Sequence, residues 1–100
     1  MPDAAALPVA PVITAYGADW CGDCRRTKRW LDASGREWKW IDRDADPAIR
    51  KMLADAGYLV IPVVVMPDGT VLVEPSDETL AHASRTLAHD RTDGRSGSQR

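Results

Sequence analysis

Residues 18–26, Ala-Asp-Trp-Cys-Gly-Asp-Cys-Arg-Arg, contain both cysteines of this 100-residue chain. Cys21 and Cys24 lie three residues apart, where an apolar run gives way to a helical pattern. Thiols at this spacing can close a small disulfide ring or, when reduced, place one thiol at a helix N-terminus. We therefore interpret the rest of the chain as a scaffold that holds this pair of thiols at the surface.

The residues on both sides of the cysteines predict a strand, a helix and a second strand. Residues 9–16 are rich in β-branched and small apolar side chains, and residues 37–43 alternate, with Trp38 and Trp40 on one face. Between them, four residues recur at helical spacing: Cys24, Thr27, Leu31 and Ser34. A helical crossover between two strands of one sheet makes those strands parallel.

The second half of the chain predicts a helix, a hairpin and a last helix. Asp46 followed by Pro47 is a typical helix start. Residues 60–66 and 71–73 read as strands, joined by a turn at residues 67–70, and Ser76 caps the last helix. In each helix, apolar or small side chains at helical spacing are predicted to face the core. They are Ile49, Met52, Leu53 and Ala56 in the first helix, and Leu80, Ala83, Ser84 and Leu87 in the second.

These elements give the order β-α-β-α-β-β-α, an α/β fold with a four-stranded mixed sheet flanked by helices. We expect one domain over residues 9–88, preceded by a flexible lead-in at residues 1–8. Residues 89–100 contain no apolar side chain and are predicted to be a disordered tail.

Composition excludes several classes of function. The chain has 44% hydrophobic and 28% charged residues, with a formal net charge of −2, which argues against an electrostatic nucleic-acid interface. No apolar run approaches bilayer length, and the start of the chain is a poor signal peptide because it has no basic residue and an early acid. We expect a cytoplasmic monomer, where a Cys-x-x-Cys pair is more often redox-active or metal-binding than structural.

The two cysteines are predicted to have different roles. Cys21 lies just before the helix, where unpaired backbone N–H groups stabilise a thiolate, whereas Cys24 lies one turn in and faces the core. Cys21 is therefore expected to attack disulfides and Cys24 to resolve the product. Asp23 disfavours a nearby anion and Arg25 and Arg26 favour it. Each charge contributes about 0.3–1 kcal/mol, so the sign of their net effect stays open.

Two other readings of the dithiol have less support. A pair of reduced core cysteines fits poorly with Gly22 and Asp23, which suit an exposed turn. A zinc site needs two more ligands, and the candidates His82 and His89 include one residue next to the predicted tail. We therefore predict no metal ligands and no bound cofactor, and keep a metal or iron–sulfur carrier only as a remote alternative.

Several motifs together resemble the glutaredoxin branch of the thioredoxin superfamily, and most closely its actinobacterial mycoredoxin-like group. The similarity extends over about residues 9–88. It rests on the element order and on these residues: Tyr16, the run Trp20-Cys21-Gly22-Asp23-Cys24, then Val60-Ile61-Pro62, Asp68-Gly69 and Pro75-Ser76.

This resemblance implies a thioredoxin fold and an enzyme that exchanges thiols and disulfides. It also implies a cis Ile61–Pro62 bond opposite the dithiol, and a last-helix N-terminus that takes a substrate carboxylate. The implied thiol-binding residues are Tyr16, Trp20, Ile61, Pro62, Ser76 and Asp77.

The implied substrates are client proteins with mixed disulfides and a small thiol, mycothiol or glutathione. Ala18, Val60 and Glu74-Pro75 depart from the pattern of glutathione-using members, and the arginine-rich and alanine-rich composition is typical of a GC-rich genome; both favour mycothiol. The alternative is a hydrogen donor that a thioredoxin reductase reduces, for a partner such as ribonucleotide reductase.

Overall fold

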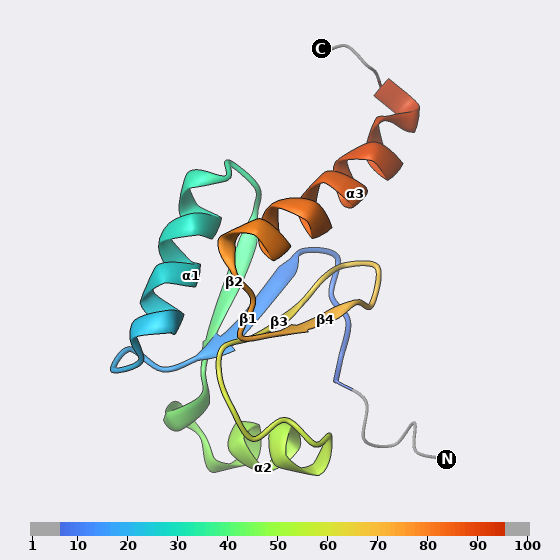
Figure 1. Ribbon diagram of the computed structural model, residues 1–100. Coiled ribbons are helices and arrows are strands. Elements are labelled where there is room, and N and C mark those ends of the chain that lie inside the picture. Colours follow the sequence, from blue (N-terminus) through green and yellow to red (C-terminus); the bar gives the residue numbers. More distant parts are fainter. Residues whose placement is uncertain (1–6, 96–100) are drawn as a thin grey trace.

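The computed structural model describes residues 7–95, and from residue 88 onward it describes only the backbone. Its elements follow the predicted order, with one additional short 3-10 helix, η2 (Figure 1). In chain order they are β1 (Ile13–Gly17), α1 (Gly22–Ala33), β2 (Trp38–Asp42), η2 (Arg43–Ala45), α2 (Pro47–Asp55), β3 (Val63–Val65), β4 (Val71–Val73) and α3 (Asp77–Arg95).

The four strands form one mixed sheet in the order β2-β1-β3-β4. Strand β1 pairs in parallel with β2 and antiparallel with β3, and β3 pairs antiparallel with β4. The predicted strand–helix–strand unit and the predicted hairpin are both confirmed. Because β1 lies inside the sheet, the loop that follows it is anchored to a strand that is paired on both sides.

The sheet separates two apolar layers, because successive side chains of a strand point to opposite faces. Ile13 and Ala15 of β1 pack with side chains of α1 and α3, whereas Tyr16 packs with side chains of α2. Figure 1 shows the same arrangement, with α1 and α3 on one side of the sheet and α2 on the other.

The predicted helix caps are confirmed. The side chain of Asp46 accepts a hydrogen bond from the backbone N–H of Ala48 at 2.9 Å, and Pro47 occupies the first turn of α2. The hydroxyl of Ser76 accepts one from the N–H of Thr79 at 3.0 Å, which satisfies a donor that the first turn of α3 leaves without a helical partner.

The strands are shorter than predicted. β1 begins at Ile13 rather than residue 9, in line with Pro11, which has no N–H to donate to a sheet. β3 begins at Val63, after Pro62, for the same reason. Before β1, the side chain of Leu7 is buried against the α2 side of the sheet, so the predicted lead-in is wrong at this residue. Residues 1–6 lie outside the described part.

Helix α3 continues to Arg95, where the sequence predicts disorder from His89. A segment without apolar residues cannot contribute to a core, but it can extend a helix that packing has already nucleated, because the helix satisfies its own backbone hydrogen bonds. The backbone of residues 89–95 is thus described as part of α3, and residues 96–100 lie outside the described part.

Candidate active site

The dithiol lies where β1 passes into α1. Cys21 is the N-cap residue of α1, and its side chain makes no capping hydrogen bond. Its backbone is fixed on both sides, since its N–H donates to the carbonyl of Ala18 at 3.2 Å and its carbonyl accepts from the N–H of Arg25 at 3.1 Å. Cys21 is half-buried, Cys24 is fully buried, and both are free thiols. The expected difference in access between the two sulfurs is therefore confirmed.

Cys24 is held in a close-fitting apolar environment. It packs with Ala18 and Ile61, and a Cβ at Gly17 would lie only 2.6 Å from its sulfur. The side chain of Trp40 closes the same space, 2.6 Å from that hypothetical Cβ. Glycine at position 17 is thus required for the close approach of β1 to Cys24.

Burial raises the pKa of the Cys24 thiol from 9.0 to about 12. The backbone N–H of Ala18 acts in the opposite direction, because it donates to the sulfur at 3.5 Å. The nearby Cys21 and the charge of Asp23 add to the increase. At neutral pH Cys24 is therefore a protonated thiol.

The segment that precedes β3 lies against the dithiol. The Ile61–Pro62 peptide bond is cis, as the resemblance predicts. Ile61 packs with Cys24, with Cys21 at the edge of the same cluster, and the carbonyl of Pro62 accepts a hydrogen bond from the N–H of Glu74 at 2.8 Å. Both Ile61 and Pro62 are buried, whereas the neighbouring Val60 is exposed.

Trp20 is exposed but held in place. The residue is 65% exposed, and its indole N–H donates to a carboxylate oxygen of Asp44 in η2 at 2.9 Å. That hydrogen bond, with the charges of Arg43 and Arg50, lowers the pKa of Asp44. The guanidinium of Arg43 also lies 5.8 Å from the centre of the Trp20 ring. The residue before Cys21 is therefore anchored to an element more than twenty residues away.

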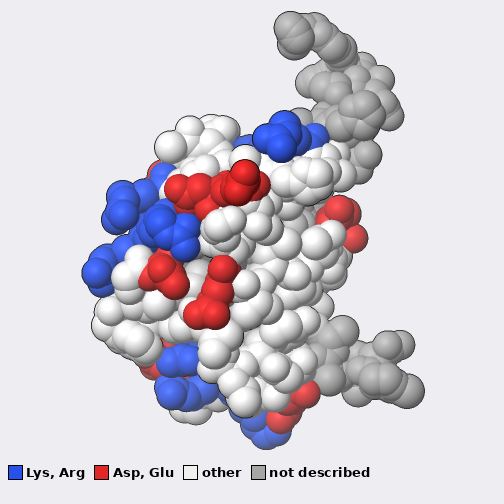
Figure 2. Space-filling view, viewed as in Figure 1, with Lys and Arg blue, Asp and Glu red and all other residues white. Residues whose placement is uncertain are grey.

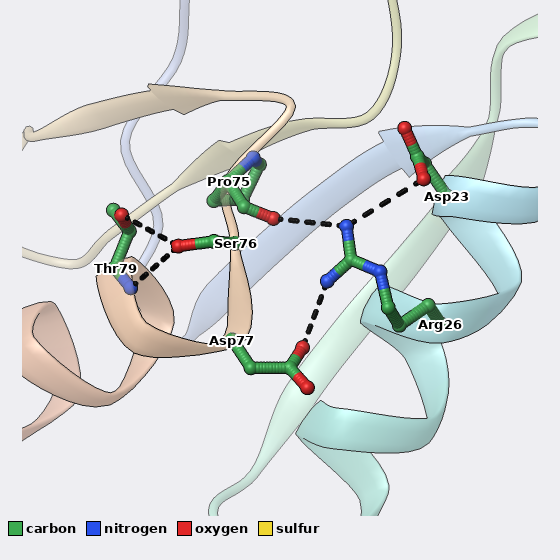
Figure 3. Close-up of polar contacts among 6 residues, drawn as sticks. All are labelled: Asp23, Arg26, Pro75, Ser76, Asp77 and Thr79. Carbon is green, nitrogen blue, oxygen red and sulfur yellow. Dashed lines mark hydrogen bonds and ion pairs between the residues drawn. The ribbon is translucent and has the colours of Figure 1, made fainter.

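Arg26 joins the N-terminal ends of α1 and α3 (Figure 3). Its guanidinium lies 2.8 Å from the carboxylate of Asp77 and 3.6 Å from that of Asp23, and it also donates to the carbonyl of Pro75 at 3.3 Å. We call Asp23, Arg26 and Asp77 the Arg26 bridge. The bridge links Asp23, which lies between the two cysteines, to Asp77, the first residue of α3.

The surface around the dithiol carries both signs of charge. Figure 2 shows basic side chains gathered over α1, with acidic side chains among them. Arg25 donates to the carbonyl of Asp19 at 2.9 Å, and Lys28 lies 3.4 Å from the carboxylate of Asp19. The basic run of α1 is therefore largely paired at the end of the helix that holds the thiols.

The structure does not bring Tyr16 into the site. Its side chain is 2% exposed and packs with Leu53, Val63 and Val65 on the α2 side of the sheet, and burial raises the pKa of its phenol. Cys24 instead packs on the residues that follow β1, beside Ile61. The interpretation of Tyr16 as a thiol-binding residue is corrected for this reason, and its contribution is to the core.

Sequence reasoning treated Arg26 only as a positive charge near the thiols, and it did not identify Asp44 as part of the site. Three aspartates alternate along the chain, at positions 42, 44 and 46. Asp42 and Asp46 do cap η2 and α2, but Asp44 binds Trp20. Capping accounts for Asp42 and Asp46 but leaves Asp44 without a local role. That difference was the one local sign that Asp44 contacts a distant residue.

The described residues contain neither a metal-ligand cluster nor a membrane-spanning helix. No three His, Cys, Asp or Glu side chains within that part are grouped as metal ligands would be. Nor does any helix there combine the length and apolar character needed to cross a bilayer.

Comparison with known proteins identifies the family. Residues 13–72 match the family model described as Glutaredoxin. The chain belongs to the glutaredoxin family. As in other glutaredoxins, the expected activity is thiol–disulfide oxidoreduction, and the Cys21–Cys24 pair is the redox-active motif.

Two relatives and one solved structure support the same assignment. Two proteins whose names place them among the glutaredoxins, from the CDC 1551 and H37Rv strains of Mycobacterium tuberculosis, are each 30% identical over 76 residues, which cover 73% of this chain and 90% of theirs. The crystal structure of a glutaredoxin from Archaeoglobus fulgidus is similar with a TM-score of 0.63 and 25% identity, covering 73% of this chain and 85% of that one. The predicted thioredoxin fold is thereby confirmed.

Proposed function

We propose that this glutaredoxin reduces mixed disulfides between client proteins and a small thiol, with Cys21 as the attacking residue. The observation that carries the proposal is the difference between the two sulfurs. Cys21 is partly open to solvent at a helix N-cap, whereas Cys24 is fully buried and has a pKa of about 12. Only one of the two sulfurs is both accessible and placed to become a thiolate.

The N-cap position of Cys21 supports its role as the attacking residue. A serine or aspartate at an N-cap accepts hydrogen bonds from the N–H groups of the first helical turn, and a thiolate can accept the same bonds. Because the side chain of Cys21 makes no capping hydrogen bond in its thiol form, those donors remain available for the anion. The positive end of the α1 dipole adds to this stabilisation.

The proposed cycle balances in two steps. The Cys21 thiolate attacks the sulfur of the small thiol in the mixed disulfide; the bond to the client breaks, and the client leaves as a thiolate that takes a proton from water. A second molecule of small thiol, as thiolate, then attacks the small-thiol sulfur bonded to Cys21. Cys21 leaves as thiolate, and the two small thiols are released as their disulfide, having supplied the two electrons.

Cys24 supplies a slower second route. Its attack on Cys21 releases the small thiol and closes the Cys21–Cys24 disulfide, but it first requires the Cys24 thiol to lose its proton. With a pKa of about 12, few molecules hold the Cys24 thiolate at neutral pH. We therefore propose that the route through a second small thiol dominates under those conditions.

We propose mycothiol as the small thiol and Trp20, Ile61 and Pro62 as its contacts. Support for the thiol comes from Ala18 and Val60, which depart from the glutathione-using pattern, and from relatives in an actinobacterium. Support for the contacts comes from the packing of Ile61 against Cys24 and the anchoring of exposed Trp20 beside Cys21.

The test is a reduction assay on a client protein that carries one mixed disulfide. Cys21→Ser is expected to abolish turnover, and Cys24→Ser to retain it, because the second small thiol replaces Cys24. Mycothiol, glutathione, and thioredoxin reductase with NADPH are compared as electron sources. Full activity of Cys21→Ser would overturn the assignment of the attacking residue. Reduction by the reductase alone, with no response to either small thiol, would favour the role of hydrogen donor instead.

A further inference from the structure

The N-terminus of α3 is already occupied by the chain's own acceptors. Ser76 accepts the N–H of Thr79, and the first turn of the helix carries the carboxylates of Asp77 and Glu78. Side chains of this kind satisfy the same N–H groups and dipole that would otherwise attract a ligand's carboxylate. The sequence analysis expected a substrate carboxylate at this end of α3. Such a carboxylate would have to compete there with the carboxylates of the protein itself.

The positive charge of Arg26 at this end of α3 is already paired with internal carboxylates. One terminal nitrogen of its guanidinium lies 2.8 Å from Asp77, while the other donates to the carbonyl of Pro75 and lies 3.6 Å from Asp23. Figure 3 shows the guanidinium between these three acceptors, with the two carboxylates approaching different nitrogens. A ligand carboxylate that reached Arg26 would have to share its charge with the carboxylates of Asp23 and Asp77.

The Arg26 bridge therefore adds a negative charge beside the thiols. It contains two carboxylates and one guanidinium, a net charge of −1, and its acids are open to solvent, with side chains 56% exposed for Asp23 and 57% for Asp77. Asp23 stands between the two cysteines in the chain, so a thiol bonded to Cys21 comes under the influence of this charge.

We propose that the Arg26 bridge makes this glutaredoxin favour small thiols without a carboxylate over thiols that carry one. Asp77 and Asp23 are the specificity-determining residues, and Arg26 holds them in place. A carboxylate on the incoming thiol gains no unpaired cation at this end of α3 and is repelled by the bridge. A neutral thiol of the same shape avoids both costs. The inference rests on the proposed function, since it concerns the thiol that reduces Cys21.

The test compares two probes that differ in one group, N-acetylcysteine and N-acetylcysteine amide. The full-length protein is first oxidised to its Cys21–Cys24 disulfide. The rate constant for its reduction by each probe is measured by quenching with iodoacetamide and counting alkylated cysteines by mass spectrometry. Each rate constant is divided by that of the same probe with bis(2-hydroxyethyl) disulfide, a neutral reference that removes the difference in intrinsic thiol reactivity.

The normalised rate is expected to be about fivefold higher for the amide than for the acid at low ionic strength, the size of one exposed charge–charge interaction. This ratio falls toward one as salt screens the bridge. Asp77→Asn is expected to lower the ratio, and Arg26→Gln to raise it, because the two acids then lose their counter-charge. General damage to the site would not move the two variants in opposite directions.

Asp55→Asn is the matched control. It makes the same change of charge in α2, where Asp55 pairs with Lys51 away from the Arg26 bridge, and it is expected to leave the ratio unchanged. A normalised ratio of one or less in the unmodified protein, or equal changes for Asp77→Asn and Asp55→Asn, would overturn the proposal. The salt dependence of the unmodified protein decides the matter even where a variant does not fold. If neither probe reduces the disulfide, the proposed function itself fails, and the inference fails with it.

Discussion

Raising the pH from 8 to 10 is expected to destabilise the reduced protein more than its Cys24→Ser variant. The folded state raises the pKa of Cys24 from 9.0 to about 12 because the thiol is buried. Three pKa units at about 1.4 kcal/mol each correspond to about 4 kcal/mol of preference for the protonated form in the folded chain. This contribution is fully present below about pH 9 and is lost as the pH rises toward 12, because the unfolded chain releases the proton first.

The window from pH 8 to pH 10 gives a defined magnitude. At pH 8 most molecules keep the proton in both states, whereas at pH 10 the unfolded thiol is ionised and the folded one is not. The unmodified protein should therefore lose about 1.4 kcal/mol more of its free energy of unfolding than Cys24→Ser over this range.

Urea unfolding of both proteins at the two pH values, under reducing conditions, measures this difference. The ¹³Cβ chemical shift of each cysteine, followed in the same range, assigns the titration to its residue. Equal losses of stability in the two proteins, or a Cys24 midpoint near 9, would refute the link between burial and protonation. The same result would also remove the reason for expecting a slow Cys24 route.

Two other substitutions test contacts around the dithiol. Gly17→Ala is expected to lower the free energy of unfolding, measured in urea, by about 1–3 kcal/mol, because its Cβ would lie 2.6 Å from the sulfur of Cys24. Gly22→Ala is the control, since a Cβ there meets nothing closer than 4.0 Å. Equal losses of stability in the two variants would contradict the argument. Asp44→Ala removes the oxygen that accepts the indole N–H of Trp20. It is expected to change the tryptophan fluorescence of the protein and to raise KM with little change in kcat, and an unchanged KM would count against an anchoring role.

Local patterns in the sequence were enough to predict most of the fold. A proline after Asp46, a serine before the last helix and alternation in the strands each depend on neighbours within a few residues. The position of Cys21 at the start of α1 and the burial of Cys24 one turn later follow from helix geometry alone. These predictions are confirmed because the physics behind them is short-range.

The same reasoning could not predict contacts between distant segments. Arg26 and Asp77 are 51 residues apart, and Trp20 and Asp44 are 24 residues apart. Nothing in a local pattern distinguishes a charged side chain that faces water from one that crosses to another element. The expectation for Tyr16 came from the family resemblance, and the packing of its side chain on the α2 side of the sheet depends on contacts with segments far along the chain.

The hydrogen bond between the Ala18 amide and the Cys24 sulfur provides a spectroscopic probe of that sulfur. The N–H of Ala18 donates to the Cys24 sulfur at 3.5 Å, so its proton resonance depends on the state of that sulfur. Ala18 is buried and follows directly on β1, which shields its amide from exchange with water. A single amide peak can therefore follow the chemistry of Cys24 in real time, without a label on either cysteine.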